Sequence, residues 1–349
     1  MWPGGGAGDG QGVCALGPDS DGALLHGLVE DARKRLDIAV YEVGPSFIRD
    51  LVGARRRGAR VRILVDAHDG ANRTTAGQLR RYRIPFRADG HAGHELHWKL
   101  LCVDDATVAV GSGNLIRRDA PPNPVPPAAG RVEPGTREWW VTVEGSAALA
   151  RRVRSAMAAA WRAAAPAIAV WPAPAVPRVA PPVGVPDVLV PPLAVDVDEA
   201  AVDLIVGGAE VAGLLRDRIA AARQRVLAIV PYAHCNTVPV MPLLDALDAA
   251  TRRGLAVRLL LGQPPSSRDA AELARRRFDV AVMDPIRTTT GHAKGLVADQ
   301  AAVVGSANWS GSGLGANREA ALLIDASAVA EYFAATHEHD WRAATPLPR

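Results

Sequence analysis

The sequence is poor in cysteine and in lysine, and it has no long apolar run. Its three cysteines, Cys14, Cys102 and Cys235, are too few and too scattered for a disulfide framework or a zinc site, so we expect them to be buried free thiols. No stretch reaches the roughly 18 apolar residues that a membrane-spanning helix needs. The first residues also lack the basic and apolar regions of a secretion signal, which predicts a cytoplasmic protein unless a signal has been removed.

A large excess of charge of either sign is also missing. The 349 residues include 40 basic and 37 acidic side chains, for a net charge of +3, and 48% of them are hydrophobic. This composition is typical of a folded protein and excludes global disorder. The small positive charge is compatible with an anionic substrate but falls short of that of a dedicated nucleic-acid binder. The length favours two domains, each with its own core.

A proline-rich segment near the middle of the chain marks a boundary between two domains. Nine prolines lie between Pro166 and Pro192, among alanines and valines. Proline lacks a backbone donor and breaks helices, so this composition favours an extended, semi-rigid connector. The sequence therefore predicts an N-terminal lobe over residues 1–165, a linker over 166–198 and a C-terminal lobe over 199–349.

The two halves repeat the same order of patterns. Each begins with an amphipathic helix pattern that runs into an apolar strand, over residues 22–43 and 209–232. A second helix, a glycine and another strand follow, with Gly58 and Gly254 as the expected helix ends. Equivalent positions lie 194 to 196 residues apart until the proline-rich stretch 118–136, which we interpret as an insertion in the first half. The chain is therefore predicted to be a tandem duplication of one α/β unit.

One motif occurs at the corresponding place in both halves. The first copy is HWKLLCVDDATVAVGSGNL, residues 97–115, and the second is HAKGLVADQAAVVGSANWS, residues 292–310. Both read His-x-Lys-x4-Asp followed by Gly-Ser-x-Asn. Residues two apart on a strand point to the same face, so each copy should present an imidazole beside an ammonium. Such a pair suits a phosphoryl group.

Lysine is rare enough for its positions to be informative. Only three basic residues are lysines, and two of them, Lys99 and Lys294, hold the same position in the two motif copies. An ammonium is a compact point charge, whereas a guanidinium is a wide planar fork. A crowded site around a tetrahedral phosphate therefore favours lysine. The third, Lys34, lies in a basic helix pattern and is expected to be exposed.

The duplicated motif resembles that of the phospholipase D superfamily, and the resemblance covers both halves apart from the linker and the termini. It implies two similar α/β lobes, each a mixed sheet flanked by helices, related by a pseudo-twofold axis with one active site between them. It also implies cleavage or transfer of a phosphodiester through a phosphohistidine, without a metal or another cofactor. One chain then supplies both halves of the site, so a monomer suffices.

The resemblance also implies roles for individual residues. His97 would attack phosphorus and His292 would act as general acid and base, although the pseudo-symmetry leaves the reverse assignment open. Four side chains would surround the non-bridging phosphate oxygens: Lys99, Lys294, Asn114 and Asn308. Two glutamates would accept hydrogen bonds that orient the histidines: Glu138 and Glu319. The other motif residues would be supporting: Ser112 and Ser306 as donors to phosphate or to those carboxylates, and Asp104 and Asp299 in turns.

A metal site is an alternative interpretation of the histidines. His91, His94 and His97 lie three residues apart beside Glu95, and this spacing suits ligands on one face of a helix. The segment leads into a predicted strand instead, so no metal is predicted. Two further histidines, His337 and His339, fall in the predicted C-terminal helix and are expected at its surface.

The resemblance leaves the substrate class open. Phospholipid headgroups are favoured, because the apolar insertion, with Trp139 or Trp140, could form a rim for acyl chains and allow peripheral membrane contact. The alternative is a nuclease acting on DNA or RNA, which the arginine-rich helices and the Gly-Ser-Ala-Asn-Trp-Ser form of the second motif support. A third is a phosphatidyl transferase of the cardiolipin-synthase type. An inactive phosphate-binding module is disfavoured, because His, Lys and Asn are intact in both copies.

Overall fold

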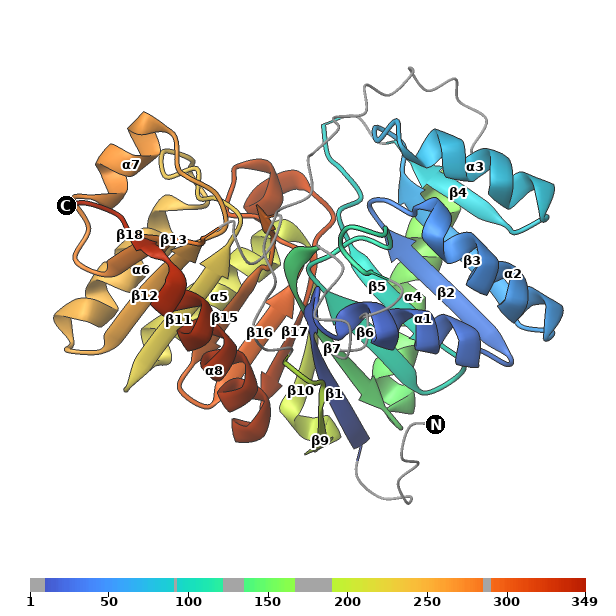
Figure 1. The fold of residues 1–349 in the computed structure, drawn as a ribbon, viewed down its shortest axis with the longest axis horizontal. Coiled ribbons are helices and arrows are strands. Elements are labelled where there is room, and N and C mark those ends of the chain that lie inside the picture. The colour runs from blue at the N-terminus through green and yellow to red at the C-terminus, as the bar shows by residue number, and fades with distance from the viewer. Residues whose placement is uncertain (1–9, 91–92, 122–134, 167–189, 285–289) are drawn as a thin grey trace, which may run out of the picture.

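The computed structural model describes residues 10–90, 93–121, 135–166, 190–284 and 290–349. Two α/β lobes meet at the centre of the molecule, with the N-terminal lobe in blue and green and the C-terminal lobe in yellow and red (Figure 1). Each lobe is a mixed sheet flanked by helices, so the expected fold class is confirmed. Most of the predicted insertion, 122–134, and of the predicted linker, 167–189, lies outside the described residues.

The first lobe is built on one large sheet with the order β8-β4-β3-β2-β5-β6-β7-β1-β9, in which β2, β3 and β4 run parallel. Its strands are β1 (Gly10–Gly17), β2 (Arg35–Val40), β3 (Arg60–Asp66), β4 (Phe86–Asp89), β5 (Lys99–Val103), β6 (Thr107–Gly111), β7 (Thr136–Glu144), β8 (Ala165–Pro166) and β9 (Leu193–Val197). One face carries α1 (Asp21–Asp31), α2 (Ile48–Arg56) and α3 (Asn72–Arg81), and the other carries α4 (Ala147–Ala163).

The second lobe repeats this sheet with the order β10-β17-β16-β15-β11-β12-β13-β18, in which β11, β12 and β13 run parallel. Its strands are β10 (Val202–Val206), β11 (Arg225–Val230), β12 (Ala256–Leu261), β13 (Asp279–Val282), β15 (Gly295–Ala298), β16 (Ala301–Gly305), β17 (Ala320–Asp325) and β18 (Thr345–Pro346). Helices α5 (Gly208–Ala221) and α6 (Met241–Arg252) lie on one face with α7 (Ser267–Leu273) beyond them, and α8 (Ser327–Ala343) covers the other.

The duplication is visible strand by strand. The segment β2, α2, β3 and the hairpin β5-β6 correspond to β11, α6, β12 and the hairpin β15-β16, in the same sheet order. Gly58 and Gly254, which follow α2 and α6, have φ of 99° and 86°. Only glycine adopts this left-handed conformation without strain, so both are helix ends, as predicted.

The two lobes share one apolar core. The inner faces of both sheets pack with α4 and α8 in a single cluster, whereas each lobe has a second cluster beneath its outer helices. Trp139 of β7 lies in the shared core and stacks on Phe333 of α8 at 4.6 Å, while Trp140 faces the outer core of the first lobe. Both tryptophans are fully buried, so the prediction that either forms an exposed rim is wrong. A central strand buries both of its faces.

Two more expectations concern single segments. Leu193–Val197, within the predicted linker, forms β9 and pairs with β1, so this part of the segment belongs to the first sheet. His337 is fully buried on α8, where its Nε2 lies 3.1 Å from the Ala228 carbonyl oxygen, so its predicted surface position is wrong. The three cysteines are buried and free, as expected. In the described part of the chain, the helices are all too short or too polar to cross a bilayer.

Candidate active site

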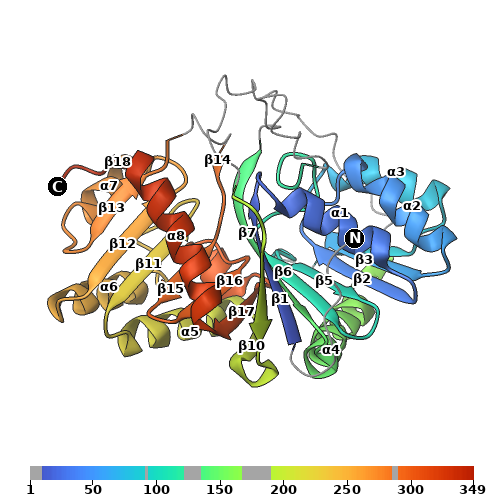
Figure 2. The same ribbon diagram turned by 60° about the horizontal axis from the view of Figure 1, so that its bottom comes forward.

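The two motif copies meet where the lobes join. Strand β14 (Thr290–Gly291) leads into the second motif and pairs with the start of β7 in the first lobe, and the His292 amide donates to the Arg137 carbonyl at 3.0 Å. The first motif is attached to the second lobe in the corresponding way, since the His97 amide donates to the Arg318 carbonyl at 3.0 Å. Figure 2 shows β14 beside β7 between the lobes. Each histidine is therefore docked by backbone bonds onto the opposite lobe.

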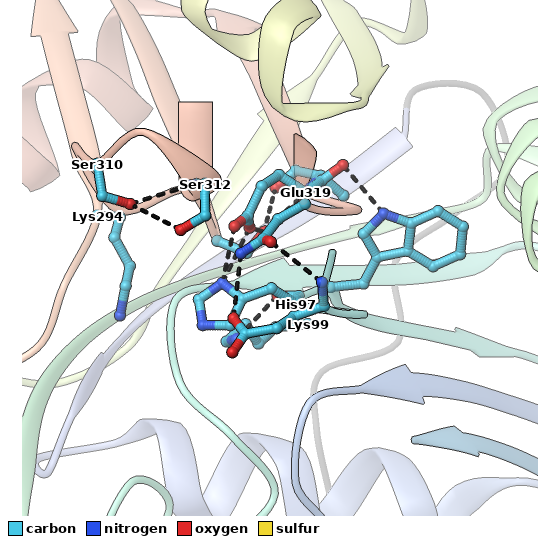
Figure 3. Close-up of polar contacts among 12 residues, drawn as sticks. His97, Lys99, Lys294, Ser310, Ser312 and Glu319 are labelled. Atoms are coloured by element: carbon cyan, nitrogen blue, oxygen red, sulfur yellow. Dashed lines mark hydrogen bonds and ion pairs between the residues drawn. The ribbon is translucent and has the colours of Figure 1, made fainter. Parts of the chain in front are cut away.

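The glutamates pair with the histidines across the interface. His97 Nδ1 lies 3.0 Å from Glu319 Oε2, and His292 Nδ1 lies 2.6 Å from Glu138 Oε1. Figure 3 shows the Glu319 carboxylate directed at the ring of His97. Both glutamates are fully buried. A carboxylate on Nδ1 fixes the orientation of the imidazole and leaves Nε2 for chemistry.

The motif serines hold these glutamates in place. Ser112 Oγ donates to Glu138 Oε2 at 2.5 Å and accepts from the Trp139 amide at 2.9 Å. Ser306 Oγ donates to Glu319 and accepts from the Ala320 amide at 3.0 Å. The sequence left open whether these hydroxyls serve the phosphate or the carboxylates. The structure shows them bound to the carboxylates.

The two motif lysines are buried side by side with the histidines. Lys99 Nζ donates to the His97 carbonyl at 2.8 Å, and Lys294 Nζ donates to the His292 carbonyl at 2.5 Å and to the Ser112 carbonyl at 3.2 Å. Burial lowers the pKa of Lys99 to about 8 and that of Lys294 to about 7, with the neighbouring Lys99 charge adding to the second shift. An anion between them would relieve this penalty.

His97 is held in its neutral form beside an ionised glutamate. Burial lowers the pKa of His97, and the charges of Lys99 and Lys294 lower it further, although Glu319 opposes them. Burial raises the pKa of Glu319, but the contact with His97, the charge of Lys99 and the Ser306 hydroxyl outweigh burial and lower it. A neutral imidazole oriented by a carboxylate is suited to nucleophilic attack.

The asparagine of the first motif binds a residue that the sequence analysis missed. The Asn114 amide N–H and Nδ2 both donate to Asp119 Oδ2, at 3.0 and 3.1 Å. The side-chain oxygens of Asn114 and Asn308 are buried without a hydrogen-bond partner. Asp119 is fully buried. Its only signal in the sequence is an acidic residue five places after the first motif asparagine, with no counterpart in the second copy.

The motif aspartates lie at the far ends of their hairpins. Asp104 and Asp299 follow β5 and β15 in the left-handed conformation, with φ of 50° and 54°. The Asp104 carboxylate accepts from three successive amides, those of residues 33, 34 and 35, at 3.2, 2.7 and 2.9 Å. Asp299 accepts from those of residues 223, 224 and 225 at 2.8, 2.9 and 3.0 Å. They join the turn of each hairpin to the start of the neighbouring strand.

An aromatic and acidic border, also missed, surrounds the first motif. The Tyr41 ring meets His97 edge-on at 5.4 Å, and Lys99 Nζ lies 5.6 Å from the same ring. The next residue, Glu42, is half-buried, and burial with the charges of Asp69 and Asp119 raises its pKa to about 7. The sequence did offer one indication of these two residues, because they directly follow β2, at the end of a parallel strand.

The described residues of the histidine-rich segment, 93–97, form no metal ligand set. Glu95 binds Asn317, whose Nδ2 donates to Oε2 at 3.1 Å, and His97 Nδ1 binds Glu319. His91 lies outside the described residues. Elsewhere in the described ranges, atoms of Asp119, Glu138 and His292 gather within 4.8 Å, but hydrogen bonds within the protein already occupy them, and we assign no metal to them.

Comparisons with known proteins agree with this architecture. A family model described as "Cardiolipin synthase, PLD-like domain" matches residues 25–123 and 215–341. The structure is similar to a phosphatidylserine synthase from Haemophilus influenzae, at 15% identity and a TM-score of 0.68 over 96% of this chain and 87% of that one. It is also similar to a polyphosphate kinase from Porphyromonas gingivalis, at 13% identity and a TM-score of 0.60 over 95% and 50%.

A third match is confined to one part of the chain. Nuc from Salmonella typhimurium, a phospholipase D family member, matches 44% of this chain with 97% of its own, at 22% identity and a TM-score of 0.38. Curated proteins give no match. At such low identities the whole-length matches show the fold alone.

Proposed function

Because the chain belongs to the phospholipase D superfamily, we propose that it cleaves or transfers a phosphodiester at the lobe interface through a covalent phosphohistidine. The observation that carries this proposal is the crossed pair of His–Glu contacts, at 3.0 and 2.6 Å, around two buried lysines. Each glutamate comes from the lobe opposite its histidine. The site therefore exists only when both halves of one chain come together, and a monomer contains all of it.

The proposed reaction uses the two histidines in different protonation states. Neutral His97 attacks phosphorus while His292 gives a proton to the departing alkoxide. His292 then takes a proton from water, or from an acceptor alcohol, whose oxygen displaces His97 from phosphorus. The phosphate oxygens are stabilised by four side chains: Lys99, Lys294, Asn114 and Asn308.

Phospholipid headgroups are the favoured substrate class. The family model is named for a cardiolipin synthase, and a whole-length structural match is a phosphatidylserine synthase. The carboxylate of Glu95 acts on Lys99 and thus borders the site. It would repel the neighbouring phosphates of a nucleic-acid strand, whereas a single phosphodiester with a neutral or cationic headgroup avoids this repulsion. A nuclease remains the second candidate. A phosphatidyl transferase differs from a phospholipid hydrolase, the first candidate, only in the acceptor, which is an alcohol in place of water.

One assay with two variants tests the proposal. We expect purified protein to release headgroup from phosphatidylcholine or phosphatidylglycerol vesicles faster than it cleaves single- or double-stranded DNA. An added primary alcohol should appear in a new phospholipid if transfer occurs. His97→Ala and His292→Ala should each lower turnover by about a hundredfold or more, and EDTA should have no effect. Normal turnover by either variant would contradict the paired mechanism.

A further inference from the structure

The two half-sites differ at a buried aspartate, Asp119. It lies five residues after Asn114, whereas the residue five places after Asn308 is Gly313, which has no side chain. Asp119 is fully buried, as an unpaired carboxylate would not be. The pseudo-symmetry of the motif is therefore broken inside the site.

The Thr136 hydroxyl lies between Asp119 and the glutamate that contacts the second-motif histidine. Its Oδ2 accepts from both nitrogens of Asn114, and its Oδ1 accepts from Arg118 Nε at 3.0 Å and lies 3.2 Å from Thr136 Oγ1. The same Thr136 hydroxyl lies 2.9 Å from Glu138 Oε1, the oxygen that contacts His292 Nδ1. Thr136 thus links Asp119 to the Glu138–His292 pair.

The other half-site has no such link. The position equivalent to Thr136 is Asn317, and its Nδ2 donates to Glu95 at 3.1 Å instead of approaching Glu319. The Glu319 carboxylate is bound by the Ser306 hydroxyl and by His97. One carboxylate therefore serves His97, whereas two lie beside His292.

Two carboxylates lie beside the His292 ring. A ring nitrogen of His292 and carboxylate oxygens of Glu138 and Asp119 lie within 4.8 Å of one another. Burial raises the pKa of Asp119, but the charges of His292 and Arg118 and the Asn114 hydrogen bond outweigh it, so the pKa is lowered and the carboxylate stays ionised. Other charged groups act on the same cluster: Lys294 on the same segment, Lys99 from β5, Arg118 on Asp119, and Asp21 of α1 near Glu138.

We propose that Asp119 is a positioning residue that, from its place beside the Glu138–His292 pair, assigns proton donation to His292 and nucleophilic attack to His97. This inference rests on the proposed function. In the first step, His97 Nε2 bonds to phosphorus, the bond from phosphorus to the leaving oxygen breaks, and His292 transfers its proton to that oxygen. In the second, His292 takes a proton from water, whose oxygen bonds to phosphorus as the P–N bond breaks.

The first test uses two soluble diesters that differ only in the leaving group, p-nitrophenolate or ethoxide. Ethoxide needs a proton to leave, whereas p-nitrophenolate does not. We expect Asp119→Asn to lower kcat/KM about tenfold or more for the ethyl ester and about twofold for the nitrophenyl ester. The ratio of kcat/KM for the two esters is independent of the fraction of folded protein. Equal losses for both esters would overturn the proposal.

A matched control comes from the outer layer of the first lobe. Asp50 is also buried against a histidine, with Oδ2 2.5 Å from His26 Nδ1, but it lies on α2 away from the motifs. Asp50→Asn should leave the ratio of the two esters unchanged. A change as large as that of Asp119→Asn would show that the ratio responds to general destabilisation, and this would also overturn the proposal.

The second test locates the covalent intermediate. His292→Ala should form phosphohistidine with the nitrophenyl ester and stall, because the group that activates water is lost. Peptide mapping after an alkaline quench should place the covalently bound phosphoryl group, the label, on His97. The variant His97→Ala should carry no such label. A label on His292 in the wild type would reverse the assignment. If the wild type cleaves no diester, the proposed function itself fails, and the inference fails with it.

Discussion

At the scale of single residues, the two motif lysines show why residue type matters in this site. Both are almost completely buried, and each ammonium donates to the carbonyl of the motif histidine two residues earlier. This contact needs a compact donor that can turn back along its own strand. The third lysine, Lys34, has a side chain that is 77% exposed. The rarity of lysine in the sequence therefore pointed to two buried positions, at which we expect a guanidinium to be too wide.

Replacing a buried lysine by arginine should therefore lower activity despite keeping the charge. We expect Lys294→Arg to reduce kcat/KM on a soluble phosphodiester by about tenfold or more, because the planar fork displaces neighbouring groups. Lys34→Arg is the matched control and should leave kcat/KM unchanged. Wild-type turnover by Lys294→Arg would show that the lysine is not required by the geometry.

The lowered pKa values of the lysines also predict a pH dependence of anion binding. With pKa values of about 7 and about 8, Lys294 and Lys99 lose their protons in the free protein as the pH rises through this range. A bound anion favours the protonated forms, so binding must take up protons above these pKa values. We expect the affinity for tungstate, a dianion at neutral and alkaline pH, to fall up to about tenfold per pH unit between about pH 7 and about pH 8, where one lysine takes up a proton. Above about pH 8, where both lysines take up protons, the fall should reach up to about a hundredfold per pH unit. Calorimetry from about pH 6 to about pH 9 would measure it, and a constant Kd would contradict the prediction.

At the scale of elements, each motif is a hairpin fastened at both ends. At one end, β5 and β15 begin next to the motif histidines, which are docked on the opposite lobe. At the other, a turn aspartate with φ near 50° accepts from three backbone amides. The aspartate of the motif therefore lies at the opposite end of the hairpin from the histidine and lysine, and it fixes the hairpin that carries them.

Removing one turn aspartate should cost stability more than chemistry. We expect Asp299→Ala to lower the free energy of unfolding by about 1–3 kcal/mol, since three amides lose their acceptor. At temperatures where the variant is folded, kcat should stay within about threefold of wild type. Denaturant unfolding measures the first quantity, with the exposed Asp217→Ala as a control that should change nothing. A hundredfold loss of kcat in folded protein would place Asp299 in the chemistry instead.

At the scale of the whole molecule, the lobes are bound together by a shared core as well as by the site. Trp139 of the first lobe packs on Phe333 of the second. A Cβ atom at Gly295 would lie only 2.1 Å from the Trp139 ring. Gly295 directly follows Lys294. The absence of a side chain there lets the tryptophan of one lobe approach the motif strand of the other, so core packing and site geometry depend on the same contact.

The shared core predicts cooperative unfolding of the two lobes. Phe333→Ala should lower the free energy of unfolding by about 3–5 kcal/mol, and calorimetry should show one transition at a lower Tm. Val238→Ala, at a site that is 87% exposed, is the control and should leave Tm unchanged. Two separate transitions, of which only one moves, would mean that the lobes unfold independently.

The sequence by itself determined the duplication, the α/β alternation and the residue types at the centre of the site, because periodicity, glycine stops and motif spacing are local properties. Tertiary structure alone decided which glutamate serves which histidine, since those partners lie 222 and 154 residues apart. It also decided the burial of Trp139 and His337, which depends on what packs against their elements. The surroundings of Asp119 depend on folding as well, because its hydrogen-bond partners come from three places in the first lobe and His292 comes from the second.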